Sequence, residues 1–300
     1  MPGPILTRRS FLLATAGLTV AAACGGGDDG EETGGATSTT TTVAEGDGRR
    51  LSVLRYFPDG TLVAGTTQRL VYGIGDSEGV PVEDVPAELR GVISLNGRQV
   101  TEVTAPRRGK GLPRPYFAFR TELEEPGVYD IDFDLEGISQ ASPFTLVETP
   151  QLATPGAGDP MVPVVTPTLA DDRGVTPICT AEPVCPLHEL PLSAALEAKR
   201  PVAFIISTPA FCQLAVCGPV LDVLLSHRDR VGDRVQMVHA EVYVNPEQSL
   251  DETTEAVKAY KLPSEPVLFL AGADGVIQTR LDNIFDEDEV GEALDQVTAG

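Results

Sequence analysis

The 300-residue sequence has little positive charge and no long apolar run. Lysine and arginine together number 22, against 44 aspartate and glutamate residues, so the formal net charge is −22. Such an acidic chain argues against nucleic acid as a partner and against charge-driven docking on anionic lipid. The apolar stretch near the N-terminus falls short of the ~20 residues that a transmembrane helix needs, and no later stretch is long enough. These absences favour folded regions that lie outside a bilayer.

The N-terminus has the pattern of a secretory signal. Arg8 and Arg9 precede a short apolar stretch that ends in small residues before Cys24. The paired arginines followed by Phe and Leu resemble the twin-arginine export signal, and Ala21-Ala22-Ala23-Cys24 resembles a bacterial lipobox, in which the cysteine is lipidated. We predict a signal peptide over residues 1–23, lipidation at Cys24 and a position on the extracytoplasmic face of the cell membrane. A secreted protein with an unmodified Cys24 is the alternative.

Composition divides the rest of the chain into four parts. Residues 24–49 are acidic and rich in Gly and Thr, which predicts a disordered tether. Residues 50–149 carry short strand patterns, and residues 150–177 form a Pro- and Thr-rich linker. Residues 178–300 alternate strand and helix patterns, among them a helix expected over residues 251–261, which predicts a mixed α/β sheet. The fold expected is therefore two domains, an all-β sandwich followed by an α/β domain.

The region of short strand patterns, residues 50–149, is predicted to be an antiparallel sandwich. Asn96-Gly97 between two apolar runs is a hairpin signal, and residues 127–133 alternate apolar with acidic side chains. Pro126-Gly127-Val128-Tyr129 resembles the start of the penultimate strand of immunoglobulin-like domains. Asp130, Asp132 and Asp134 share one strand face, which we interpret as solvated; calcium ligation is the alternative. No catalytic constellation is evident here.

Cys212 and Cys217 are the candidate catalytic residues of the α/β region. They follow the apolar run Val202–Ile206 directly, with four residues between them, and Gly218-Pro219 comes after the second cysteine. A helix that begins near Pro219 would place its positive end beside the pair and favour a thiolate. Cys212 is then the attacking thiol and Cys217 the resolving one. A permanent structural disulfide is the alternative.

The order of strands and helices resembles the thioredoxin-like superfamily, in its TlpA-like and peroxiredoxin-like branch. In that family a cis proline just before a strand faces the redox cysteine, and Pro266 matches this place. The resemblance implies exchange with protein thiols or disulfides and no cofactor. The apolar strand before Cys212 lacks the buried acid that thioredoxins use as a proton acceptor. Copper handling or a non-enzymatic binding module is the second hypothesis, and a thiol peroxidase is a third.

Disulfides persist outside the cytoplasm, and the four cysteines after Cys24 allow three pairings. The spacing favours neighbours, so Cys179 and Cys185 are expected to form a structural disulfide. The alternative adds His188 as a third ligand to zinc or copper, but no fourth ligand is evident in the sequence. His239 lies on a predicted strand and is interpreted as a hydrogen-bonded core histidine. The sequence therefore predicts no metal centre.

Overall fold

The computed structural model describes residues 44–46, 49–58, 60–135, 138–148, 154–212 and 215–299. The predicted signal peptide 1–23, the lipidation site Cys24 and the tether up to residue 43 lie outside the described residues, and those predictions stay untested. Among the described helices, none is both long and apolar enough to cross a membrane.

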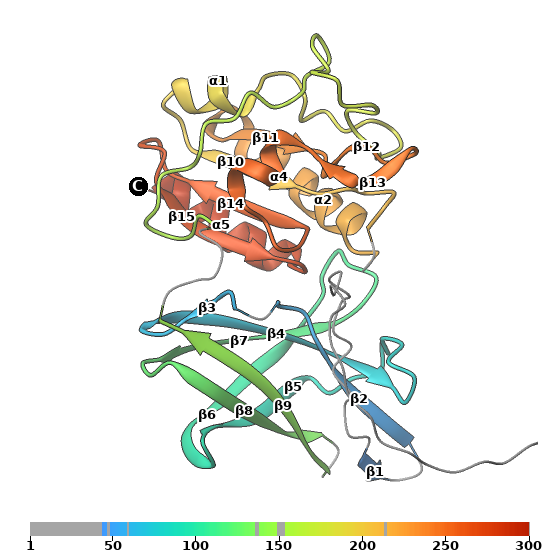
Figure 1. Cartoon of the computed structure of the whole chain (residues 1–300), viewed down its shortest axis with the longest axis vertical. Helices are drawn as coiled ribbons and strands as arrows, with labels where there is room; N and C mark the ends of the chain where they lie inside the picture. The colour runs from blue at the N-terminus through green and yellow to red at the C-terminus, as the bar shows by residue number, and fades with distance from the viewer. Residues whose placement is uncertain are drawn as a thin grey trace, which may run out of the picture. The chain divides into compact units, whose positions relative to one another are not determined.

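The described residues between 44 and 147 form a β-rich fold, which confirms the coarser part of the fold prediction. The strands are β1 (Ala44–Gly46), β2 (Arg49–Arg55), β3 (Leu62–Val63), β4 (Thr66–Asp76), β5 (Glu88–Leu95), β6 (Arg98–Arg108), β7 (Tyr116–Leu123), β8 (Gly127–Leu135) and β9 (Ile138–Val147). They hydrogen-bond in the order β1-β2-β4-β7-β6-β5-β8-β9-β3, and Figure 1 shows the sheet curling on itself. All neighbours are antiparallel except β3 and β9.

Strand β6 joins the two halves of this curled sheet. Its residues 98–106 pair with β5, and Arg107 and Arg108 pair with β7. Asn96 and Gly97 link β5 to β6 with φ of 52° and 75°, the left-handed conformation that the predicted hairpin turn requires. The curled sheet encloses one apolar core drawn entirely from residues 51–146.

Strand β8 shows how sequence alternation produces this core. Tyr129, Ile131, Phe133 and Leu135 are buried, and Asp130, Asp132 and Asp134 alternate with them on the outer face. Successive side chains of a strand point to opposite faces, so period-two alternation gives one apolar and one polar surface. The three aspartates are not among the described side chains that converge as a metal-ligand group.

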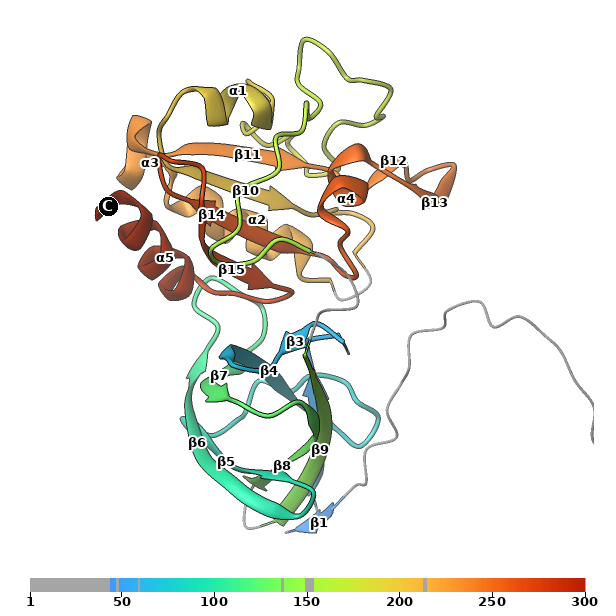
Figure 2. The same cartoon turned by 60° about the vertical axis from the view of Figure 1, so that its left-hand side comes forward.

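The second region contains a four-stranded mixed sheet, ordered β11-β10-β14-β15 (Figure 2). Its strands are β10 (Val202–Ile206), β11 (Gln236–Ala240), β14 (Val267–Ala271) and β15 (Ile277–Asp282). Strand β10 runs parallel to β11 and antiparallel to β14, and β14 forms a hairpin with β15. Both central strands are buried along their whole length, which is typical of a sheet covered on two faces.

Helices cover both faces of this sheet. The helical segments are α1 (Leu192–Glu197), α2 (Cys217–Ser226), α3 (Arg228–Val231), the 3-10 turn η1 (Gly232–Arg234), α4 (Glu255–Tyr260) and α5 (Glu287–Ala299). One core combines Ala203, Ile205, Leu268 and Leu270 with side chains of α2 and α5. The other combines Val202, Phe204, Ile206, Val267 and Phe269 with side chains of α1 and α4. Alternate residues of β10 and β14 thus supply two separate cores.

One predicted element is partly wrong. Residues 251–261 were expected to be helical, but β13 (Ser249–Thr253) pairs antiparallel with β12 (Tyr243–Asn245), and helix α4 begins only at Glu255. Thr253 is half-buried beside Tyr243, and this pairing outweighs the local helix preference of the acidic residues. The consequence for the site is small, because α4 still packs on the same face of the sheet.

An ion-pair cluster links α5 to the curled sheet. The carboxylate of Glu289 accepts hydrogen bonds from Arg69, Arg120 and the hydroxyl of Tyr116. Glu289 is fully buried at its side chain, and Arg69 is nearly so. Asp286, whose carboxylate accepts the backbone N–H of Glu289, caps the helix. These contacts hold the start of α5 against strands β4 and β7.

Candidate functional site

Cys212 and Cys217 lie together at the end of strand β10. The strand ends at Ile206, the connecting loop carries Cys212, and α2 begins at Cys217, two residues before the predicted start at Pro219. Cys217 is fully buried and Cys212 is half-buried. The hydrogen bond from Cys217 to Cys212, together with burial, raises the pKa of the Cys217 thiol. Of the two thiols, Cys217 therefore keeps its proton more tightly. Cys212 is the sulfur that solvent and a substrate can reach, because it is the less buried of the two.

Pro266 lies at the neighbouring strand end. Val267, the first residue of β14, pairs with Ile206, the last residue of β10, so Pro266 and the start of the cysteine loop share one edge of the sheet. The Glu265–Pro266 peptide bond is cis, as predicted. Pro266 itself is buried.

Glu265 is a polar neighbour of the cysteine pair that sequence reasoning missed. Burial raises the pKa of its carboxyl, and the charge of Cys212 raises it further. Tyr243 on β12 lies close enough to sense Glu265 and both cysteines, and its pKa is raised by burial and then by those charges. A glutamate beside a predicted cis proline could have been found from the sequence. Strand β10 itself is wholly apolar, as expected, and the acid comes from the segment just before β14, the neighbouring strand.

A second cluster brings together Cys179, Cys185, His188 and His239, all buried. Their ligand atoms lie within 4.8 Å of one another. The Nδ1 of His239 lies 3.1 Å from His188 Nε2, 3.3 Å from Cys185 Sγ and 3.7 Å from Cys179 Sγ. The first three residues come from the connector before α1, and His239 comes from strand β11.

Hydrogen bonds polarise the two thiols of this cluster in opposite directions. The bond from Cys185 lowers the pKa of Cys179, and the same bond, with burial, raises the pKa of Cys185. Burial alone would lower the pKa of His239, but its bond with Cys179 and the charge of Glu241 outweigh burial and raise it. The cluster thus stabilises one thiolate beside an imidazole.

Cys179 and Cys185, which were expected to form a disulfide, are both free thiols in the structure. Their sulfurs face the ring of His239 and do not join each other, and the backbone N–H of Cys185 donates to Cys179 Sγ at 3.5 Å. His239 is a buried strand histidine, as interpreted, but it also supplies the fourth ligand atom that the sequence did not reveal. It lies 51 residues after His188, and only the pairing of β11 with β10 brings it to the connector.

The two cysteine sites are joined by a short polar bridge. Thr180 follows Cys179 and donates its hydroxyl to the buried carboxylate of Glu241 at 2.8 Å. The same hydroxyl accepts the backbone N–H of Ala210, two residues before Cys212, at 3.1 Å. Burial raises the pKa of Glu241. The connector that carries the Cys/His cluster therefore also supports the loop that carries Cys212.

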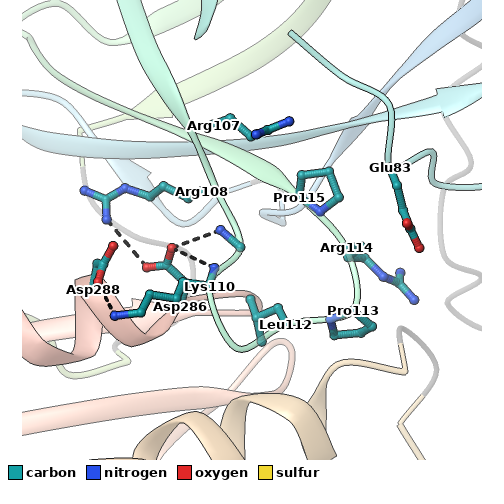
Figure 3. Close-up of a pocket in the computed structure, with 11 residues that line it drawn as sticks. Glu83, Arg107, Arg108, Lys110, Leu112, Pro113, Arg114, Pro115, Asp286 and Asp288 are labelled. Carbon is teal, nitrogen blue, oxygen red and sulfur yellow. Dashed lines mark hydrogen bonds and ion pairs between the residues drawn. The ribbon is translucent and has the colours of Figure 1, made fainter. Parts of the chain in front are cut away.

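A pocket of about 370 Å³ lies beside the β6–β7 loop, and Figure 3 shows its charged lining. Arg108 pairs with Asp286 at 3.5 Å, and Lys110 pairs with Asp288 at 3.2 Å. Asp286 also accepts the backbone N–H of Gly109. The charges of Arg108 and Lys110 are already paired with carboxylates, so neither side chain is available to bind an anion in this pocket. We therefore interpret the pocket as part of the contact that anchors α5.

In comparisons with known proteins, no family model matches this sequence and no curated protein matches it significantly.

Proposed function

We propose that this chain exchanges thiols and disulfides through Cys212 and Cys217, on the extracytoplasmic face of a membrane to which a lipid on Cys24 attaches it. The observation that carries the proposal is the placement of both cysteines between the end of β10 and the start of α2, with Cys212 half-buried in the loop and Cys217 fully buried at the first residue of the helix. An accessible sulfur beside a protonated, shielded partner is the arrangement that an attacking and a resolving cysteine need.

The sheet supports the same proposal. A central strand parallel to one neighbour and antiparallel to the other, followed directly by the cysteine helix, is the arrangement of thioredoxin-like domains. A cis proline before β14 lies in the place where that family has one. The curled β sheet with its own core would then be a separate, immunoglobulin-like domain.

The exchange proceeds in two balanced steps. The Cys212 thiolate attacks a sulfur of the substrate disulfide; that S–S bond breaks, and the departing thiolate takes a proton. Cys217 then loses its proton to the Glu265 carboxylate or to water and attacks Cys212 Sγ. The second substrate thiol leaves, and Cys212 and Cys217 end joined in a disulfide. A dithiol donor must reduce this disulfide before the next cycle.

Trapping the mixed disulfide tests the proposal. With Cys217→Ser, a denatured disulfide-bonded protein should accumulate as a covalent adduct at Cys212, because the resolving thiol is missing. The matched variant Cys212→Ser should form no adduct at Cys217, since that thiol is buried. Intact-mass spectrometry reads both. Equal trapping by the two variants, or none by either, would contradict the proposal.

Copper handling through the same two sulfurs is the second candidate, since both cysteines lie between the end of β10 and the first residue of α2. Soft thiolates bind Cu(I). The reduced protein would then bind one Cu(I) that Cys212→Ser and Cys217→Ser each release. No binding at micromolar Cu(I) would reject this candidate.

A further inference from the structure

We propose that Cys179, Cys185, His188 and His239 bind one Zn²⁺ ion, independently of any thiol exchange at Cys212. The distances between their ligand atoms carry the proposal. Tetrahedral zinc with bonds of about 2.0–2.3 Å to nitrogen and sulfur has ligand atoms about 3.3–3.8 Å apart. The distances from His239 Nδ1 to the three other ligand atoms are 3.1, 3.3 and 3.7 Å.

Hydrogen bonding alone does not account for this convergence. A ring nitrogen either donates one hydrogen bond or accepts at its single lone pair, yet His239 Nδ1 faces two sulfurs and a second ring nitrogen. His188 turns its Nε2 to this point, while its other nitrogen, Nδ1, is buried with no hydrogen-bond partner among the residues that the structure describes. Four buried metal-ligand atoms around one point are better satisfied by a shared cation than by each other.

The surroundings also orient the ligands. The Nε2 of His239 lies 3.1 Å from the carbonyl oxygen of Ser207 and 3.0 Å from its hydroxyl. A proton on Nε2 donated to that carbonyl leaves the Nδ1 lone pair directed at the cluster, as in histidine ligands held by an outer hydrogen bond. The backbone N–H of Cys185 donates to Cys179 Sγ, which disperses thiolate charge.

The ligand set selects zinc over the other common ions. Two thiolates and two neutral imidazoles balance the charge of a divalent cation, so the buried centre is neutral overall. A closed set of two sulfur and two nitrogen ligands is typical of structural zinc, whereas calcium and magnesium prefer oxygen. The four side chains are buried, so the site leaves no position open for a substrate and we assign it a structural role.

The bound ion would fasten the connector to the sheet. Cys179, Cys185 and His188 lie outside regular strands and helices, while His239 belongs to β11. A backbone hydrogen bond already joins the two, from His239 N to Leu187 O at 3.1 Å. Because Thr180 supports Ala210, fixing Cys179 also fixes the base of the loop that carries Cys212.

Metal binding is measured on the full chain, reduced and loaded with equimolar Zn²⁺. Native mass spectrometry should show one zinc per chain, and competition with a chelator should show at least tenfold weaker binding in Cys185→Ser and His239→Asn. The matched control is His227→Asn, which changes the one histidine outside the cluster and should leave affinity unchanged. The double variant that replaces Cys212 and Cys217 with serine should also keep its zinc.

Cobalt(II) alone provides a readout on the unaltered protein, should a variant fail to fold. A site with two sulfurs and two nitrogens gives the intense visible bands of tetrahedral cobalt and thiolate charge-transfer absorption. Removing zinc should also reduce hydrogen-exchange protection of residues 178–188 while residues 116–123 keep theirs. The proposal is overturned if the chain takes up no zinc at micromolar metal, if it takes up Cu(I) but no zinc, or if cobalt gives an octahedral spectrum. A Cys179–Cys185 disulfide in the purified chain, or loss of zinc in His227→Asn, would also overturn it.

Discussion

Replacing Glu289 with glutamine should destabilise the protein, because that carboxylate is the buried partner of Arg69. Two effects on the pKa of Glu289 oppose each other. Burial raises it, but the charge and hydrogen bonds of Arg69 outweigh burial and lower the pKa from 4.5 to about 2. The pKa of Arg69 moves upward for the reciprocal reason, against the effect of its own burial. Both shifts describe one favourable ion pair.

The size of the effect follows from linkage between protonation and folding. A folded-state pKa about 2.5 below that of the unfolded chain corresponds to about 3 kcal/mol of stability at neutral pH. The Glu289→Gln variant also leaves Arg69 charged and buried without its partner, which costs roughly 3–5 kcal/mol in comparable cases. We therefore expect a loss of about 3–5 kcal/mol at pH 7.

The pH dependence has a definite sign. Because the folded-state pKa is lowered, the contribution of Glu289 is fully present above about pH 4.5, and it declines as pH falls and is lost through about pH 2. Urea unfolding at pH 7, 5 and 3 gives the free energy of unfolding of both proteins. The difference between them should shrink at the lowest pH.

A matched variant on the same helix controls for general effects of losing an acid. Glu292 is exposed and lies 3.7 Å from Arg108, so Glu292→Gln should change stability by less than about 1 kcal/mol. The reasoning is refuted if Glu289→Gln and Glu292→Gln unfold alike at pH 7, or if the loss in Glu289→Gln stays constant down to pH 3.

Two further predictions concern the cysteine pair and the core. Glu265→Gln removes a negative charge beside Cys212, so the pH midpoint of Cys212 alkylation should fall. Exchange at pH 7 should slow, because glutamine cannot accept the proton that Cys217 releases. The control Glu247→Gln, at an exposed position, should change neither quantity, and an unaltered exchange rate in Glu265→Gln would remove the role of Glu265. Phe204→Ala empties a fully buried site in β10 and should cost about 3–5 kcal/mol in urea unfolding. Val128→Ala, at an exposed position of β8, should cost less than about 0.5 kcal/mol, and a similar cost for both would contradict the assigned core.

Strongly patterned segments were predicted well from the sequence. The apolar run Val202–Ile206 is β10 at the predicted bounds, and the Asn96-Gly97 turn joins the expected pair of strands. Such elements are determined by residues that are neighbours in the chain. Residues 249–253 were missed because a partner strand, and not local preference, decides their conformation.

The candidate sites divide in the same way. Cys212, Cys217 and Pro266 were found because a strand end, a helix start and a proline mark them locally. His239 was missed as a site residue because it reaches its cluster only through strand pairing, whereas Glu265 was overlooked although it directly precedes Pro266 in the sequence. A buried strand histidine near two cysteines has no local signal for metal binding, and the spacing of Cys179 and Cys185 favoured a disulfide that the free thiols do not form.

The reduction potential of the Cys212–Cys217 couple tests the central claim most directly. The full chain is equilibrated in thiol–disulfide buffers of graded potential, and the fraction of oxidised pair is read by alkylation and mass spectrometry. An exchange protein should titrate above about −300 mV, the range of reactive disulfides. A couple that stays oxidised well below that potential while the fold remains native would show a permanent structural link and contradict the proposed function.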